Sequence, residues 1–120
     1  IDFTVENDFV TAIKGDGVDA IHFREYMEAW DDRNAYGMSH VGWGMHPRAR
    51  WVSAAMYDKR DMQAVEFRAL AGSFLWSTGA NQYAGRYTLG HFDLPMRNCT
   101  IALDGKVVVR QGVLQGELVL

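Results

Sequence analysis

The chain of 120 residues is long enough for one small domain with a hydrophobic core, since 48% of its residues are hydrophobic and four are Trp. The 12 Lys and Arg are scattered and outnumbered by 15 Asp and Glu, so the net charge is -3 and no basic stripe exists to neutralise nucleic-acid phosphates. No apolar run approaches the ~20 residues that span a bilayer. We therefore expect neither a nucleic acid nor a membrane as a partner.

The single cysteine indicates the cellular compartment, and the first residues indicate that the chain is part of a longer protein. Cys99 has no second cysteine to pair with, which excludes an internal disulfide and favours a reducing compartment, the cytoplasm. The chain opens at Ile1 on residues typical of the middle of a strand. We expect residues 1–120 to form one metal-binding domain of a longer protein.

The first third of the chain predicts a hairpin and a helix. Apolar residues surround Asn7 and Asp8, which tolerate the positive φ of a tight turn, and this predicts a hairpin over residues 3–13. Apolar residues then recur at close to helical spacing, which predicts an amphipathic helix over residues 18–30. The short polar side chains of residues 31–34 compete with the helical backbone and should end it.

The rest of the chain predicts one more helix and several strands. Good helix formers over residues 61–71, with Asp61 as the N-cap, predict the helix, and the β-prone run 73–79 predicts a buried strand followed by a loop up to Leu89. Asp104 and Gly105 between apolar runs predict a hairpin with a type I′ turn, followed by a last short strand or tail. The fold class expected is α+β, a mixed, antiparallel-rich sheet packed by about two helices.

A candidate metal clamp begins the strand predicted at residues 90–95. Strand side chains alternate between faces, so His91 and Asp93 point the same way and Phe92 points opposite. With one further imidazole this pair would form a 2-His-1-carboxylate site, which leaves open positions on a non-heme iron. The alternative is a solvated or hydrogen-bonded polar edge. Apolar and glycine neighbours indicate partial burial, and a buried Asp needs a cation to offset its lost hydration.

Three further histidines compete for the third position. Residues 38–44 predict a short strand, on which His40 shares a face with Gly42 and Gly44. The small size of these glycines would leave space above the imidazole; the alternative is a core histidine bonded to a carbonyl. His46 is the second choice, because the cations of Arg48 and Arg50 disfavour another positive centre. His22, near the start of the first helix, reads as an ordinary surface or capping histidine.

Four segments together resemble one family. They are SHVGWG at residues 39–44, RARW at 48–51, FLWSTGAN at 74–81 and HFDLP at 91–95, and they resemble the C-terminal portion of the 2,5-dihydroxypyridine 5,6-dioxygenases, a non-heme iron branch related to aminopeptidase T type metallopeptidases. The resemblance implies Fe(II) bound by His40, His91 and Asp93. It also implies cleavage of a small aromatic substrate, 2,5-dihydroxypyridine, by O₂ to N-formylmaleamate in nicotinate-type degradation, and a homo-oligomer.

Two other functions stay open. A metallopeptidase would use two metal ions, which need bridging carboxylates, and the acidic residues between His40 and His91 (Asp58, Asp61 and Glu66) show no ligand-like pair. A catalytically silent assembly domain would use its aromatic residues at an interface. Trp43, Phe92 and Tyr87 are candidates to sandwich a flat ring, or else they belong to the core.

Overall fold

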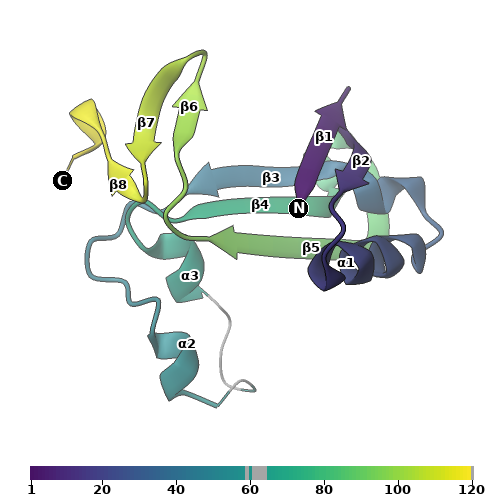
Figure 1. The fold of residues 1–120 in the computed structure, drawn as a ribbon, viewed down its shortest axis with the longest axis horizontal. Helices are drawn as coiled ribbons and strands as arrows, with labels where there is room; N and C mark the ends of the chain where they lie inside the picture. Colours follow the sequence, from purple (N-terminus) through teal and green to yellow (C-terminus); the bar gives the residue numbers. More distant parts are fainter. Residues whose placement is uncertain (59, 61–64, 120) are drawn as a thin grey trace. The chain divides into compact units, whose positions relative to one another are not determined.

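The computed structural model describes residues 1–58, 60 and 65–119. The chain divides into two compact units, the first made of Ile1–His40 with Ser77–Asp93 and the second of Val41–Trp76 with Leu94–Leu120. Figure 1 shows the strands and helices of both units. The two units are described separately below.

The first unit opens with the predicted hairpin. Strands β1 (Asp2–Glu6) and β2 (Phe9–Lys14) pair antiparallel, with a register shift at Thr4/Val5. Asn7 and Asp8 between them have φ of 49° and 69°, the left-handed conformation that their side chains tolerate better than most. The hairpin prediction is confirmed.

A helix follows, two residues shorter than predicted. Helix α1 (Val18–Glu28) buries Ala20, Phe23 and Met27, whose spacing of three and four residues places them on one face. The predicted stop at residues 31–34 is confirmed, because Asp32 there caps a separate 3₁₀ turn, η1 (Arg33–Tyr36), by accepting from Asn34 N. The sequence did not predict this turn.

Three strands lie side by side in the order β3-β4-β5 (Figure 1). They are β3 (Met38–Trp43), β4 (Phe74–Asn81) and β5 (Arg86–Met96), and each contributes residues to both units. The strand predicted over 38–44 is confirmed, but the loop predicted after Gly79 is wrong. β4 continues to Asn81, the short turn η2 (Gln82–Ala84) follows, and β5 begins at Arg86 rather than at Gly90.

Gly79 explains this error. Its φ is 107°, and a Cβ there would lie 1.9 Å from the carbonyl oxygen of Gly90. The glycine therefore serves the close approach of two strands and does not break one.

The second unit contains the other predicted hairpin. Strands β6 (Ile101–Leu103), β7 (Lys106–Arg110) and β8 (Val113–Leu114) form an antiparallel sheet in that order. Asp104 and Gly105 have φ of 48° and 81°, the two positive values of a type I′ turn, so this prediction is confirmed. The turn η3 (Gly116–Leu118) follows β8.

The helices of this unit are short. Helix α2 (Ser53–Met56) was not predicted, and of the helix predicted over 61–71 the described part is α3 (Val65–Ala69). Residues 61–64, with the proposed N-cap Asp61, lie outside the described residues. The predicted end is wrong by two residues, because Leu70 and Ala71 instead form parallel bridges with His46 and Gly44.

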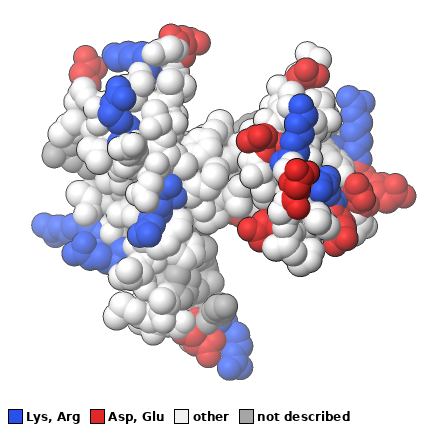
Figure 2. All heavy atoms as spheres, in the orientation of Figure 1, with Lys and Arg blue, Asp and Glu red and all other residues white. Residues whose placement is uncertain are grey.

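The α+β, antiparallel-rich fold class is confirmed by these sheets and helices. Among the described residues, no helix is both long and apolar enough to cross a membrane. On the face drawn in Figure 2, Lys and Arg stand in separate small groups between uncharged and acidic residues. That distribution agrees with the scattered charges of the sequence.

Candidate metal centre

The three predicted ligands lie together in the first unit. His40 comes from β3, and His91 and Asp93 come from β5. The Nε2 atoms of His40 and His91 each lie 3.4 Å from Oδ1 of Asp93, and the two imidazole rings are 5.9 Å apart between centroids. Residues more than 50 positions apart in the chain thus meet at one carboxylate oxygen.

The central strand makes this meeting possible. Neighbouring strands lie about 4.8 Å apart, so β3 and β5 are separated by about twice that distance with β4 between them. The β4 residue in contact with His40 is Ser77, which is fully buried. Because its side chain is small, the longer side chains from the outer strands can meet above the middle of the sheet.

Burial along β5 alternates strictly around the clamp. Arg86 and Gly90 are buried, whereas His91 and Asp93 have side chains that are 43% and 36% exposed. The opposite orientation of Phe92 is confirmed, since its ring packs edge-on against Phe23 with 4.7 Å between centroids. The clamp is therefore partly buried, as predicted, with one side open.

The environment of His40 differs from both interpretations of the sequence. Its Nδ1 lies 2.8 Å from Ser77 Oγ and 3.3 Å from Ser39 Oγ, so its partners are hydroxyls and not a carbonyl. A Cβ at Gly44 would lie 2.1 Å from the backbone oxygen of Leu70. The expectation of open space is therefore wrong for Gly44, which lets two backbones approach each other, whereas at Gly42 a Cβ would meet no atom within 4 Å.

The other two histidines have different surroundings. His46 belongs to the second unit, where its Nδ1 accepts a hydrogen bond from Arg48 N at 3.1 Å and its backbone bridges Leu70. His22 is exposed on α1.

Of the three aromatic residues considered for a ring sandwich, one lies on the clamp face of β5. Tyr87, four residues before His91, is 69% exposed. Phe92 is wrong as a sandwich residue because it contacts Phe23 and Tyr26 in the aromatic cluster on the opposite face. Trp43 belongs to the second unit.

The donor set and its spacing fit a metal ion in part. Metal bonds of about 2.0–2.2 Å to His nitrogen and carboxylate oxygen place neighbouring donors about 3–3.5 Å apart, and both measured separations are 3.4 Å. Among the described residues, however, no three such side chains already close around a single point. Two imidazoles and one carboxylate are nevertheless the ligand types of a non-heme Fe(II) site.

Two of the acidic residues considered for a second metal ion have other partners within the second unit. In the second unit, Asp58 pairs with Arg60 at 3.3 Å, and Glu66 accepts a hydrogen bond from Arg50 N at 2.6 Å. Asp61 lies outside the described residues. The described carboxylates thus give no support to a two-metal centre.

An open cavity of about 360 Å³ adjoins His40. Asn81, at the end of β4, shapes it: Asn81 Nδ2 donates to Ser39 O at 2.9 Å and Asn81 Oδ1 accepts from Ala84 N at 3.2 Å, which fixes the η2 turn against β3. Sequence reasoning missed this residue, although Asn before a turn is a common capping signal. The lining residues are Ser39, His40, Ala80, Asn81, Gln82 and Tyr83.

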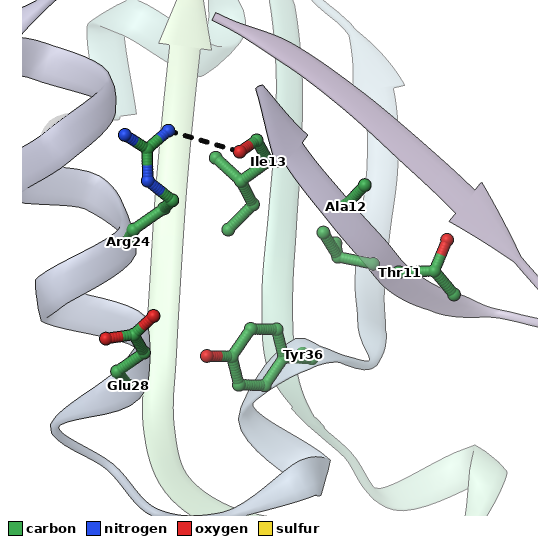
Figure 3. Close-up of a pocket in the computed structure, with 7 residues that line it drawn as sticks. Thr11, Ala12, Ile13, Arg24, Glu28 and Tyr36 are labelled. Carbon is green, nitrogen blue, oxygen red and sulfur yellow. Dashed lines mark hydrogen bonds between the residues drawn. The ribbon is translucent and has the colours of Figure 1, made fainter. Parts of the chain in front are cut away.

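A second cavity, of about 150 Å³, lies between α1, β2 and η1 (Figure 3). Arg24 in its wall donates to Ile13 O at 3.2 Å and to Gly15 O at 3.0 Å. Burial and the charge of Glu28 raise the pKa of Tyr36 there. Because the guanidinium is occupied by backbone carbonyls and the clamp residues are not part of the wall, we place the candidate function at His40.

Comparisons with known proteins show the family of the chain. Residues 1–116 match the family described as 2,5-dihydroxypyridine 5,6-dioxygenase. The chain is 44% identical over 114 residues to the 2,5-dihydroxypyridine 5,6-dioxygenase of Pseudomonas putida KT2440, covering 93% of this chain and 32% of that protein. A solved structure of the 2,5-dihydroxypyridine dioxygenase from the same organism superposes with a TM-score of 0.83 at 42% identity, over 97% of this chain and 34% of the other. The chain spans about a third of the length of these relatives.

Proposed function

Because the chain belongs to the 2,5-dihydroxypyridine 5,6-dioxygenase family, we propose that it supplies the Fe(II) centre of a ring-cleaving dioxygenase, with His40, His91 and Asp93 as the protein ligands. The observation that carries this proposal is the convergence of both imidazole Nε2 atoms on one oxygen of Asp93, at 3.4 Å each. Two nitrogens and one oxygen match the 2-His-1-carboxylate site of non-heme Fe(II) enzymes. Catalytic zinc also takes two imidazoles and one carboxylate, and the dioxygenase family favours iron between the two.

The proposed reaction rests on the activity for which the relatives are named and, for its product and pathway, on the family resemblance. The substrate is 2,5-dihydroxypyridine, the bond cleaved lies between C5 and C6, and both atoms of O₂ enter N-formylmaleamate, so no separate reductant is needed. The reaction would serve nicotinate-type degradation. A bound Fe(II) supplies open positions at which the substrate and O₂ are brought together.

The chain's own residues contribute position and charge. The carboxylate of Asp93 offsets part of the charge of a cation, and His40 is held by its hydroxyl contacts. The cavity of about 360 Å³ beside His40 has the volume for a single flat ring, and Tyr83 in its lining offers an aromatic surface to that ring. The exposed sides of the imidazoles leave the approach open.

The test uses the full-length protein that contains these residues. The metal-free protein is loaded with Fe(II) without oxygen, and metal content, O₂ uptake and product are then measured with 2,5-dihydroxypyridine. We expect one iron per chain, one O₂ consumed per ring and N-formylmaleamate as product. Two zinc or cobalt ions per chain with peptide hydrolysis would instead establish a metallopeptidase, and a protein without iron or O₂ uptake would be an assembly domain.

We also infer a cytoplasmic homo-oligomer, which rests on the single Cys99 and on the family resemblance. Light scattering of the full-length protein measures its mass in solution. A mass equal to one chain would contradict the oligomer and leave the metal centre unaffected.

A further inference from the structure

Gln82 is a polar residue of the candidate site to which the proposed function gives no role. Its side chain is exposed and lines the cavity of about 360 Å³ beside His40. Among the described residues, its carboxamide has no hydrogen-bond partner. A carboxamide that the fold does not use is available to a ligand in the cavity.

The turn that carries Gln82 is held by its own hydrogen bonds. Gln82 O accepts from Gly85 N at 3.0 Å, and Asn81 Oδ1 accepts from Ala84 N at 3.2 Å. Asn81 Nδ2 donates to Ser39 O at 2.9 Å and so ties the turn to β3. The backbone of Gln82 is therefore fixed, and only its side chain has to become ordered when a ligand binds.

The other polar side chains that line the cavity are already engaged or lack a paired donor and acceptor. Ser39 Oγ gives its one hydrogen to a backbone carbonyl at 2.6 Å, and the amide of Asn81 binds backbone groups at both ends. His40 is a proposed metal ligand, and the side chain of Tyr83 carries a single oxygen. Gln82 thus offers the cavity a free N–H donor and a free oxygen acceptor on one planar group.

The substrate of the proposed reaction carries the complementary pair of groups. 2,5-Dihydroxypyridine has a tautomer in which position 2 is a lactam, with N1–H beside the C2 carbonyl. A carboxamide and a lactam are complementary, because each presents one donor and one acceptor in the same plane. Two parallel hydrogen bonds therefore join the two groups when their planes align.

We propose that Gln82 is the specificity-determining residue that recognises this lactam, with its Oε1 accepting from N1–H and its Nε2 donating to the C2 oxygen. The inference rests on the proposed function, which places the ring in the cavity beside His40. The bond to be cleaved, C5–C6, has to lie nearest the metal position beside Asp93. The C2 carbonyl lies across the ring from C5, so it points away from that position and toward the cavity wall.

The same contact selects the bond that is cleaved. C5 has two ring neighbours, C4 and C6, and a ring held only at C5 can turn over about the C2–C5 axis and exchange them. N1–H lies next to C6, on one side of that axis, so a carboxamide that accepts from N1–H admits one of the two orientations. In that orientation C6, and not C4, lies where O₂ is brought to the ring.

The experiment compares Gln82→Leu with Gln111→Leu in the full-length protein, loaded with Fe(II) and kept free of oxygen. Leu is close to Gln in size but has neither donor nor acceptor. Gln111 is the matched control, because it is an exposed glutamine of the second unit whose side chain also has no hydrogen-bond partner among the described residues. Both variants should keep the melting temperature and the iron content of the wild type, since neither side chain is buried or a metal ligand.

Two ligands are titrated into each protein, and their dissociation constants are measured. Phenol keeps a hydroxyl on an aromatic ring but has C–H groups where 2,5-dihydroxypyridine has its lactam. We expect Gln82→Leu to bind 2,5-dihydroxypyridine about tenfold more weakly, the effect of losing a pair of neutral hydrogen bonds, and to bind phenol as the wild type does. Gln111→Leu should bind both ligands as the wild type does. Once oxygen is admitted, the kcat of Gln82→Leu at saturating substrate should also fall, because part of the bound ring is then turned over.

Equal weakening of both ligands by Gln82→Leu would mean that Gln82 acts through its shape, and unchanged binding of 2,5-dihydroxypyridine would mean that the lactam is held by another group. Either result would overturn the inference and leave the metal centre intact. A wild-type protein that binds no Fe(II), or that binds Fe(II) but no 2,5-dihydroxypyridine, would instead defeat the proposed function itself.

Discussion

The two faces of β5 in the first unit differ in burial and in the residues they carry. On β5, Arg86 and Gly90 are buried and Phe92 packs into an aromatic cluster, whereas His91 and Asp93 on the other face are partly exposed. The inward face supplies apolar contact and so fixes the strand, which leaves the outward face free of packing demands. A rigid strand that presents its ligands outward holds them more precisely than a loop would.

The inward face also ties the ligand strand to the N-terminal hairpin. The Arg86 guanidinium pairs with Asp8, donates to Met38 O and lies 4.9 Å from the ring centroid of Phe9. Gly37 allows this, because a Cβ there would collide with the Arg86 side chain. The difference between the faces predicts that substitutions on one change metal binding and substitutions on the other change stability.

The largest effect is expected from the outward face. Replacing His40, His91 or Asp93 by alanine removes a direct ligand, so iron content and ring cleavage should fall by more than the roughly 100-fold upper range seen for outer partners. Because these side chains are partly exposed, the fold should persist. Metal analysis, O₂ uptake and circular dichroism of the full-length variants check this.

His46→Ala is the control for these variants, and it should retain most of its iron. Its side chain is engaged by Arg48 N in the second unit. A His46→Ala protein that loses iron while His40→Ala keeps it would exchange the roles of the two histidines. Full iron retention by Asp93→Ala would remove the 2-His-1-carboxylate site from consideration.

The inward face should respond in the opposite manner. Phe92→Ala removes edge-on contacts with Phe23 at 4.7 Å and with Tyr26 at 5.3 Å. We expect a loss of about 3 kcal/mol in the free energy of unfolding, the lower end for Phe→Ala since the ring is half-buried. Denaturant unfolding measures it. A stable Phe92→Ala protein with weakened iron binding would contradict the division between the faces.

The sequence predicted those parts of the fold that depend on local chemistry. Asn7 with Asp8, and Asp104 with Gly105, placed both hairpins correctly, because positive φ is a property of the residues themselves. The shared face of His91 and Asp93 was also predicted correctly, because side chains alternate along a strand. The structure adds that His40 reaches the same carboxylate.

What the sequence did not predict depends on neighbours distant in the chain. Gly79 and Gly44 were read as a strand end and as open space, yet each accommodates the backbone of another segment. Ser77 carries no local signal of its contact with His40, which lies 37 positions earlier. Such pairings arise only when strands are brought together.

The substitution Gly90→Ala tests the packing of the inward face by adding a single methyl group. A Cβ there would lie 2.6 Å from Ala35 Cβ and 3.0 Å from the Trp30 ring. We expect Gly90→Ala to cost about 1–3 kcal/mol, as overpacking does, measured by thermal or denaturant unfolding. Gly42→Ala is the matched control, because a Cβ at Gly42 of β3 meets no atom within 4 Å. Equal stability of the two variants would show that Ala35 and Trp30 shift to accommodate the added methyl group.

The smallest effect concerns the turn that joins α1 to β3. Hydrogen bonds from the Thr88 side chain and from Asn34 N lower the pKa of Asp32 below its ordinary value of 3.8, and Thr88 Oγ1 in turn accepts from Gly90 N at 3.0 Å. A lowered pKa in the folded state contributes stability that is fully present above pH 3.8 and is lost as pH falls through the lower folded value. Asp32→Asn keeps an oxygen for the cap but cannot ionise. Its melting temperature should therefore lie slightly below that of the wild type at neutral pH, with the difference vanishing only below pH 3.8. A difference that stayed constant down to the acid limit would mean that the charge of Asp32 contributes nothing and that the cap acts through geometry alone.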